Sequence, residues 1–270
     1  MVDPTHIDQF ATLIRDAKQT LIFTGAGVST ASGIPDFRGP QGVWKTRQPV
    51  YFQDFQSSEK ARVEYWEQKL EAYDAFREAE PNAVHDACVD LEQAGKVTAV
   101  ITQNVDGLHT KAGTSRGCLV EIHGTNSEIE CLSCGNRYEP DLYYRAFADT
   151  RTLPRCGCGG LVKAATISFG QNLREDDMRR AFAAAADADL VVSLGSTLSV
   201  HPAASIPLEA AMRGVPYVIV NQGETDQDTH PAVTILFDGD VTEIFPNAVR
   251  EALSGTEERE DGPSGLSRAG

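Results

Sequence analysis

The sequence predicts an α/β protein whose parallel sheet is covered by helices on both faces. Apolar, β-branched runs of strand length alternate along the chain with stretches of helical periodicity. That alternation favours parallel pairing, because each crossover between parallel strands places a helix on one face of the sheet. A length of 270 residues is enough for one full core and a smaller module, and a segment with paired cysteines interrupts the alternation. The smaller module should therefore be an insert.

The expected elements follow these patterns in chain order. Ile7, Phe10 and Ile14 recur at helical spacing, and a strand at 20–25 then ends in a glycine turn. Residues 34–50 show no hydrophobic periodicity, and a helix is expected from about 57 to 78. Residues 81–95 read as a second helix, with Pro at its start and Gly at its end. The other expected strands are 97–102, 119–122, 166–169, 190–194, 217–221 and 234–237, and the other expected helices are 176–186, 203–213 and 241–253.

The composition limits the classes of partner and location. A net charge of −15 with scattered Lys and Arg argues against nucleic acid as a partner and favours a lysine-rich one. The N-terminus shows no signal-peptide pattern, and Asp187 and Asp189 break the apolar run from 181 to 194. We therefore expect a cytoplasmic protein that does not enter a membrane; the sequence leaves its oligomeric state open.

Four of the six cysteines form two close pairs, Cys131/Cys134 and Cys156/Cys158. In a reducing cytosol this spacing favours one structural Zn²⁺ held by four thiolates, and two buried pairs of free thiols are the alternative. The second pair is separated by one residue only, and we expect Gly157 to permit this short turn by adopting dihedrals that other residues avoid.

These elements define two domains and a tail. A Rossmann-like domain is expected from residues 1–33, 82–124 and 164–253. A small domain, made of a helical module and a zinc ribbon, is expected from 34–81 and 125–163, and the cleft between the two should be the binding site. The tail, 254–270, has too few apolar residues to fold and should be disordered.

Polar side chains gather after two of the expected strands. Gln103, Asn104 and Asp106 follow the strand at 97–102, and His123 follows the strand at 119–122. Ligands of open parallel sheets bind outside the carboxyl ends of the strands, so we expect these side chains to form the functional site. A lone strand-end histidine is more often a core residue, but the polar neighbours of His123 favour a catalytic role.

The loop Gly25-Ala26-Gly27-Val28-Ser29 also follows a strand. Its small residues could let the backbone approach a pyrophosphate while the Ser29 hydroxyl points at it. A plain tight turn is the alternative, because Thr30 stands where the usual fingerprint has its third glycine.

A second loop, Gly33 to Gly39, pairs a carboxylate and a guanidinium around an aromatic ring. Arg38 could hold a phosphate, Asp36 a ribose hydroxyl, and Phe37 could keep water from a reactive carbon. The alternative is a surface ion pair between Asp36 and Arg38.

Together these motifs resemble those of the sirtuins, which are NAD-dependent protein lysine deacylases. The resemblance, of a bacterial type, runs from about residue 21 to 240 and rests on the glycine loop, Gly33 to Trp44, Thr102 to His109, His123-Gly124, the cysteine pairs and Gly195-Ser196-Thr197. It implies NAD as cofactor, acylated-lysine proteins as partners, and deacetylation, with transfer of the acyl group to ADP-ribose and release of nicotinamide.

The resemblance also implies a role for each matching residue. His123 is the catalytic base and Asn104 acts beside it, while Phe169, Gly170 and Gln171 bind the substrate backbone. The implied contacts to NAD are Gly25, Ala26, Gly27, Ser29, Asp36, Phe37, Arg38, Gln103, Asn104, Val105, Asp106, Gly195, Ser196, Thr197, Asn221 and Val241.

General chemistry agrees with these roles. An amide oxygen is a poor nucleophile, so it can attack only a ribose carbon that already has positive character, held in a dry pocket. A ribose hydroxyl must then lose a proton, and a neutral imidazole such as His123 can accept it. Two alternatives stay open: a mono-ADP-ribosyltransferase on the same scaffold, and a non-catalytic module that binds NAD or ADP-ribose. Retention of His123, Asn104 and Asp106 together argues against the module, which needs no base.

Two departures from the family pattern concern the substrate. Gln171 stands where an acidic residue is more common, and Gln68 stands where sirtuins that remove acidic acyl chains have the arginine of a Tyr-x-x-Arg pair. We expect neutral acyl groups to be preferred, since no cation would face a distal carboxylate.

Overall fold

The computed structural model describes residues 4–36, 42 and 47–257 of the chain. Its main sheet is parallel throughout, with the strand order β3-β2-β1-β7-β8-β9, which confirms the predicted α/β class. The strands are β1 (Thr20–Thr24), β2 (Val97–Thr102), β3 (Leu119–Glu121), β7 (Leu190–Leu194), β8 (Tyr217–Asn221) and β9 (Ile235–Asp238).

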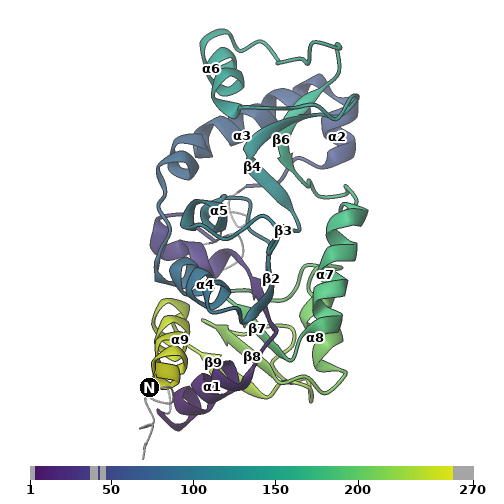
Figure 1. Ribbon diagram of the computed structural model, residues 1–270. Coiled ribbons are helices and arrows are strands. Elements are labelled where there is room, and N and C mark those ends of the chain that lie inside the picture. The colour runs from purple at the N-terminus through teal and green to yellow at the C-terminus, as the bar shows by residue number, and fades with distance from the viewer. Residues whose placement is uncertain (1–3, 37–41, 43–46, 258–270) are drawn as a thin grey trace, which may run out of the picture.

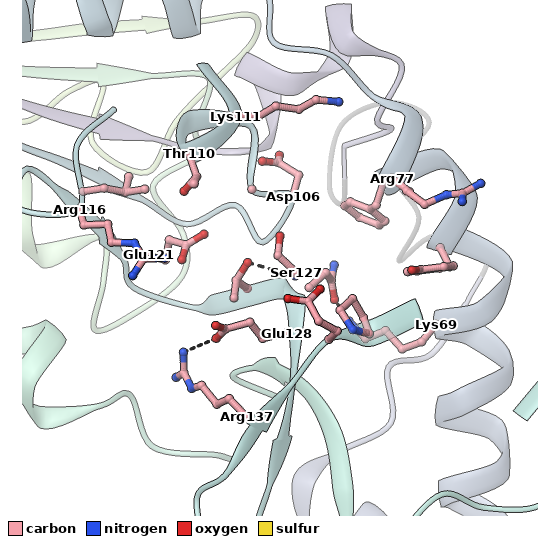
Figure 2. A pocket seen from close by; sticks show the side chains of 18 of the residues that line it. Lys69, Arg77, Asp106, Thr110, Lys111, Arg116, Glu121, Ser127, Glu128 and Arg137 are labelled. Carbon is pink, nitrogen blue, oxygen red and sulfur yellow. Dashed lines mark hydrogen bonds and ion pairs between the residues drawn. The ribbon is translucent and has the colours of Figure 1, made fainter. Parts of the chain in front are cut away.

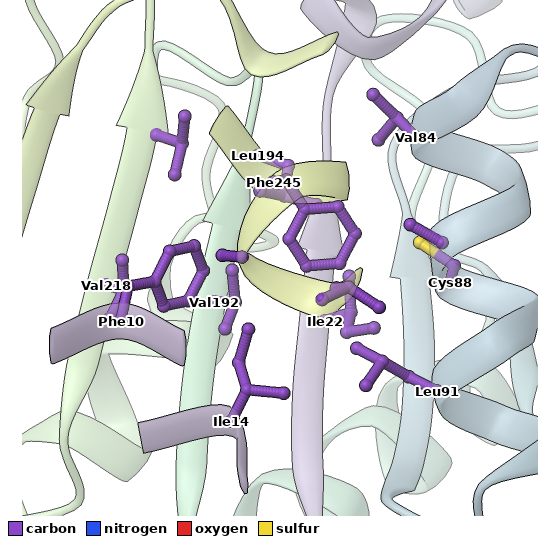
Figure 3. Packing of buried hydrophobic residues seen from close by; sticks show 14 of the residues in the cluster. Phe10, Ile14, Ile22, Val84, Cys88, Leu91, Val192, Leu194, Val218 and Phe245 are labelled. Atoms are coloured by element: carbon purple, nitrogen blue, oxygen red, sulfur yellow. The ribbon is translucent and has the colours of Figure 1, made fainter. Parts of the chain in front are cut away.

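Helices cover both faces of this sheet (Figure 1). One face packs against α1 (Pro4–Asp16), α4 (Ala83–Gln93) and α9 (Val241–Glu257), and the other against α7 (Glu175–Asp187) and α8 (Ser205–Ala211). Successive strand residues point to opposite faces, so Ile22 faces the first group and Leu21 the second. Figure 3 shows Ile22, Val192 and Val218 packed beneath Phe10, Ile14, Leu91 and Phe245.

A smaller antiparallel sheet, in the order β5-β4-β6, lies at the other end of the molecule (Figure 1). It consists of β4 (Gly124–Cys131), β5 (Arg137–Tyr138) and β6 (Val162–Thr166). The helices α2 (Phe52–Ser57), α3 (Glu59–Glu78) and α6 (Pro140–Thr150) share an aromatic core with it, formed by Phe55, Tyr65, Trp66, Tyr144 and Phe147.

The structure corrects three sequence-based expectations. The strand expected at 166–169 is instead β6, which pairs with β4 in the small sheet and spans the expected boundary at 163/164. The helix expected from about 57 to 78 is α3, which begins two residues later, at Glu59, and a further helix that was not predicted, α2, ends just before it. Ser58 separates the two and caps α3, accepting from the Ala61 N–H at 3.3 Å. In the expected tail, residues 254–257 belong to α9, and the rest lies outside the described residues.

Two short helices beside the main sheet had no clear sequence signal. The 3₁₀ helix η1 (Ala26–Ser32) follows β1, and α5 (Leu108–Ala112) follows the turn after β2. No helix within the described ranges is long and apolar enough to cross a membrane.

Candidate active site

The carboxyl ends of the parallel strands meet at one edge of the main sheet, which faces the small module (Figure 1). The turn after β1 and the turn after β7 are in direct contact there. Gly27 donates its N–H to Gly195 O at 2.8 Å, and Gly25 donates to Leu194 O at 2.9 Å. An added Cβ on Gly25 would lie 2.7 Å from Gly195 O, and one on Gly27 would lie 2.7 Å from the Gly195 Cα. Glycine is therefore required by backbone packing, and the Gly27 amide is already used within the protein.

A buried polar network joins the glycine turn to the turn after β2. Asn104, which is 5% exposed, donates from Nδ2 to Gly25 O and to Ser29 Oγ, both at 3.0 Å. Ser29 in turn donates to Asp106 Oδ2 at 2.7 Å, and Asp106 Oδ1 accepts from the Leu108 N–H at 2.9 Å. The Asp106 carboxylate is thus held by one donor from each side.

A small cavity lies against this network. Its lining is Ala26, Ser29, Ile34, Pro35, Phe76, Asn104, Val105 and Asp106. Five of these residues are expected cofactor contacts, whereas Ile34, Pro35 and Phe76 were not predicted. Phe76 had only the helical period of α3 as a signal, which does not separate a cavity wall from a core residue.

His123 is held between the two sheets. Its Nδ1 lies 3.1 Å from Gln103 O, and its own carbonyl accepts from the Ile167 N–H at 2.7 Å. Gly124, which follows, has φ +73 and would place a Cβ 2.1 Å from Ala165 O. The close approach of β4 and β6 therefore requires glycine after the histidine. Gln103 bonds Ser196 Oγ through Nε2 at 2.8 Å, so the turns after β2 and β7 are also linked.

The other expected cofactor residues lie along the same edge. Thr197 Oγ1 lies 2.8 Å from Ser199 Oγ, and Asn221 donates to Gly223 O at 2.8 Å within its own loop. Val241 begins α9 and its side chain packs in the core, so its contribution to a ligand would come from the backbone. Asp36 is half-buried, whereas Phe37 and Arg38 lie outside the described residues.

The expected substrate loop is tied to the helical module. Phe52 N–H donates to Phe169 O at 2.9 Å, and Gln53 Nε2 donates to Gly170 O at 3.1 Å. Gly170 has φ +79, which suits glycine. Gln171 folds back, and its Oε1 accepts from the Ser168 N–H at 3.1 Å. The structure thus brings this loop beside α2, while His123 and the polar network lie at the sheet edge.

A cleft of about 1100 Å³ lies on the side of Asp106 that faces α3, β4 and α7. Figure 2 shows its charged lining, in which Arg137 pairs with Glu128. Glu121, at the end of β3, also lines it, and burial raises the pKa of this carboxyl group to about 7. Asp106 and Glu128 act in the same direction, and the Thr125 hydroxyl and Arg137 act against it.

The four paired cysteines converge at one point of the small module. Their Sγ atoms all lie within 4.8 Å of one another, with Cys131 to Cys158 at 3.7 Å and Cys134 to Cys156 at 3.6 Å. Tetrahedral Zn–S bonds of about 2.3 Å place neighbouring sulfurs about 3.8 Å apart, so the donor set fits one Zn²⁺ ion. All four are free cysteines rather than disulfides.

The surroundings of the cysteines support a metal site. Tyr138 Oη lies 2.9 Å from Cys156 Sγ, and the Ser133 N–H donates to Cys131 Sγ at 3.4 Å. The backbone N–H of Cys158 and the Tyr138 hydroxyl lower the pKa of Cys156 to about 6, which favours the thiolate.

The reason expected for the short spacing between Cys156 and Cys158 was wrong. Gly157, between them, does not have a left-handed φ, whereas Gly159, which follows the pair, has a φ of +83°.

The fold and site define an α/β protein with a ligand site at its sheet edge and an inserted zinc ribbon. The Sir2 family model matches residues 25–202, more than half of the chain, and the chain belongs to that family. An "NAD-dependent protein deacetylase" of Rhodopseudomonas palustris is 42% identical over 223 residues, covering 82% of this chain and 88% of the relative. One from Haloarcula marismortui is 38% identical over 252 residues, covering 92% and 95%.

Solved structures give the same result. A structure described as "Structural Basis for the Mechanism and Regulation of Sir2 Enzymes" is 35% identical, with a TM-score of 0.82, covering 93% of this chain and 99% of that one. A Sir2 variant with a deacetylated p53 peptide and 3′-O-acetyl ADP ribose is also 35% identical with a TM-score of 0.82, covering 91% and 98%.

Proposed function

We propose that this protein is an NAD-dependent protein lysine deacetylase, which transfers the acetyl group of an acetyl-lysine to ADP-ribose and releases nicotinamide and free lysine. Its similarity to deacetylases over 82% to 92% of the chain supports this. The observation that carries the proposal is the arrangement of His123, Gln103, Asn104, Ser29 and Asp106 at one sheet edge.

The protein's own residues divide the work as follows. The Gly25 to Ser29 turn offers a closely packed backbone for the pyrophosphate, as glycine turns at strand ends do. Asp106 and Val105, in the lining of the small cavity, receive the amide of nicotinamide, and Asn104 fixes the orientation of Ser29 and Asp106. When bound, NAD supplies the ribose carbon that the acetyl oxygen attacks and the hydroxyl that receives the acetyl group.

His123 acts as the general base for that hydroxyl. The Gln103 carbonyl can only accept a hydrogen bond, so Nδ1 of His123 carries the proton and Nε2 carries the lone pair of the neutral ring. Nε2 is then the atom that takes the proton. Phe169, Gly170 and Gln171 would hold the peptide backbone, and the zinc ion would fold the small module without entering the reaction, because four thiolates leave it no open position.

Mass spectrometry of an acetyl-lysine peptide tests the proposal. Incubation with the protein and NAD should yield deacetylated peptide, nicotinamide and O-acetyl-ADP-ribose, and omission of NAD should abolish all three. A mass increase of ADP-ribose on protein or peptide, with the acetyl-lysine intact, would instead identify a mono-ADP-ribosyltransferase. Binding of NAD with no product of either kind would identify a non-catalytic module.

A further inference from the structure

Two histidines lie buried behind the candidate site and take no part in the proposed chemistry. His85 is 0% exposed and His109 is 2% exposed. His85 stands in the first turn of α4 and His109 in α5, three residues after Asp106. Their ring centroids are 4.8 Å apart and the rings are tilted by 60°.

One nitrogen of each ring is bonded to an element of the site. The Asn82 N–H donates to His85 Nδ1 at 3.2 Å, so this nitrogen is an unprotonated acceptor. The Asn82 side chain in turn donates to Val28 O, in the glycine turn, at 2.8 Å. His109 Nε2 lies 3.0 Å from Oγ1 of Thr24, the last residue of β1 before that turn.

The remaining nitrogens, His85 Nε2 and His109 Nδ1, are buried, and neither has a hydrogen-bond partner among the residues that the structure describes. Buried polar atoms in native proteins are rarely left unpaired. With both rings neutral, one arrangement of protons joins these two atoms: His85 Nε2–H donates to His109 Nδ1, and His109 Nε2–H donates to Thr24 Oγ1. The ring centroids are 4.8 Å apart, a separation at which two imidazoles can share an N–H···N hydrogen bond.

A charge on either ring would break this arrangement. A protonated His109 would direct an N–H at the N–H of His85, with no acceptor between them. Burial lowers the pKa of His109 to about 3, with His85 adding to the effect. Burial also lowers the pKa of His85, while Asp106, Asp86 and the Asn82 backbone act in the opposite direction.

We propose that His85 and His109 form a neutral, hydrogen-bonded pair that positions the glycine turn and the Asp106 turn relative to each other, and so sets the affinity of the site for NAD. The proposal rests on the proposed function, which gives these two turns their ligand. Asp106 accepts from the N–H of Leu108, the first residue of α5, at 2.9 Å, so a shift of the helix that carries His109 moves the carboxylate that Ser29 contacts. Both histidines are positioning residues.

A double-mutant cycle tests the pair, with NAD affinity measured by calorimetry. His85→Leu and His109→Leu should each weaken binding roughly 10- to 100-fold, because each leaves a buried polar partner unpaired. The double variant should lose less than the product of the two single losses, since neither partner remains. His6→Leu, at an exposed position of α1, is the control and should bind as the parent does.

Nitrogen-15 spectra of the unmodified protein give a second readout that does not depend on how the variants fold. Both rings should carry their proton on Nε2 at pH 7 and should titrate below the ordinary range of a histidine. A proton on Nδ1 of either ring, strictly additive losses, or unchanged NAD affinity in destabilised single variants would overturn the proposal. None of these measurements needs turnover of acetyl-lysine, so a failure of the proposed function would be seen separately.

Discussion

Nδ1 of His123 and the carbonyl oxygen of Gln103 lie 3.1 Å apart, and this contact fixes how the imidazole can act. Gln103 follows β2 and His123 follows β3, and these strands are neighbours in the main sheet. In the neutral ring this contact leaves the lone pair on Nε2, the atom that we propose takes the proton.

Replacement of His123, the proposed base, should remove most of the activity. His123→Ala should lower deacetylation on the order of 10²- to 10⁴-fold, the usual range for loss of a general base, and NAD binding should largely survive. Peptide turnover and NAD calorimetry on the same preparation measure both effects. His201→Ala, which removes an exposed histidine bonded to Ser205, is the matched control and should stay near the parental rate. An active His123→Ala variant would assign the base elsewhere.

The metal should stabilise the small module without entering the reaction. Purified protein should contain one tightly held zinc ion, and Cys131→Ala or Cys158→Ala should lower the melting temperature of the module. Soluble, active protein without zinc would contradict this.

The glycines beside the cysteines give a finer comparison. Gly159 has φ +83, so Gly159→Ala should strain the backbone and weaken zinc retention. Gly157→Ala should have little effect, because its φ is not left-handed and an added Cβ meets nothing within 4 Å. Similar zinc loss from the two variants would argue against this account of the short spacing.

The Glu121 carboxyl group should make stability depend on pH. Burial raises its pKa from 4.5 to about 7 in the folded protein, so its contribution to stability is fully present below pH 4.5 and is lost as the pH rises through 7. Glu121→Gln removes this dependence. The free energy of unfolding of the variant relative to the parent should therefore rise between pH 4.5 and pH 8, as measured by urea titration. A constant difference over that range would show that the carboxyl group titrates normally.

The parallel sheet could be predicted from the sequence because its central strands β1, β7 and β8 are fully buried and read as largely apolar runs rich in β-branched residues. The residues of β2, β7 and β8 match the expected ranges, and those of β1 and β3 differ by one. The strand β6 was misplaced because Ala164 and Ala165 lower its apparent β propensity, while pairing with β4 overrides that preference. Strand signals that depend on a partner cannot be read from one segment.

The site residues could be predicted from the sequence where polar side chains follow predicted strands. Gln103, Asn104, Asp106 and His123 stand directly after strands, and the structure brings them together. The support beneath them was not predictable, because Asn82 contacts Val28 across 54 residues. The Pro81-Asn82 start of α4 could have indicated a helix cap, but not which turn the cap would bind.

Neutral acyl groups should be better substrates than acidic ones. Gln68, the counterpart of the arginine in sirtuins that take acidic chains, donates to Gln48 O at 3.2 Å and to Glu64 Oε1 at 3.3 Å. Lys69, the nearest cation in sequence, donates to Asn126 Oδ1 at 2.8 Å, and burial lowers its pKa to about 8. A carboxylate that is buried without a cation to pair with costs several kcal/mol, enough to slow turnover by orders of magnitude.

Rates on one peptide that bears acetyl, myristoyl or succinyl groups measure this preference. Acetyl-lysine should be processed, myristoyl-lysine tests how long a neutral chain is accepted, and succinyl-lysine should be the poorest substrate. A succinyl rate equal to or above the acetyl rate would contradict the expectation.

The central claim is that cleavage of NAD is coupled to removal of the acetyl group from lysine. The most direct measurement follows nicotinamide and deacetylated peptide together in one reaction with saturating NAD. The account predicts that the two products appear at equal rates and that both require the acetyl-lysine peptide. Nicotinamide release without deacetylated lysine, or deacetylation in the absence of NAD, would contradict it.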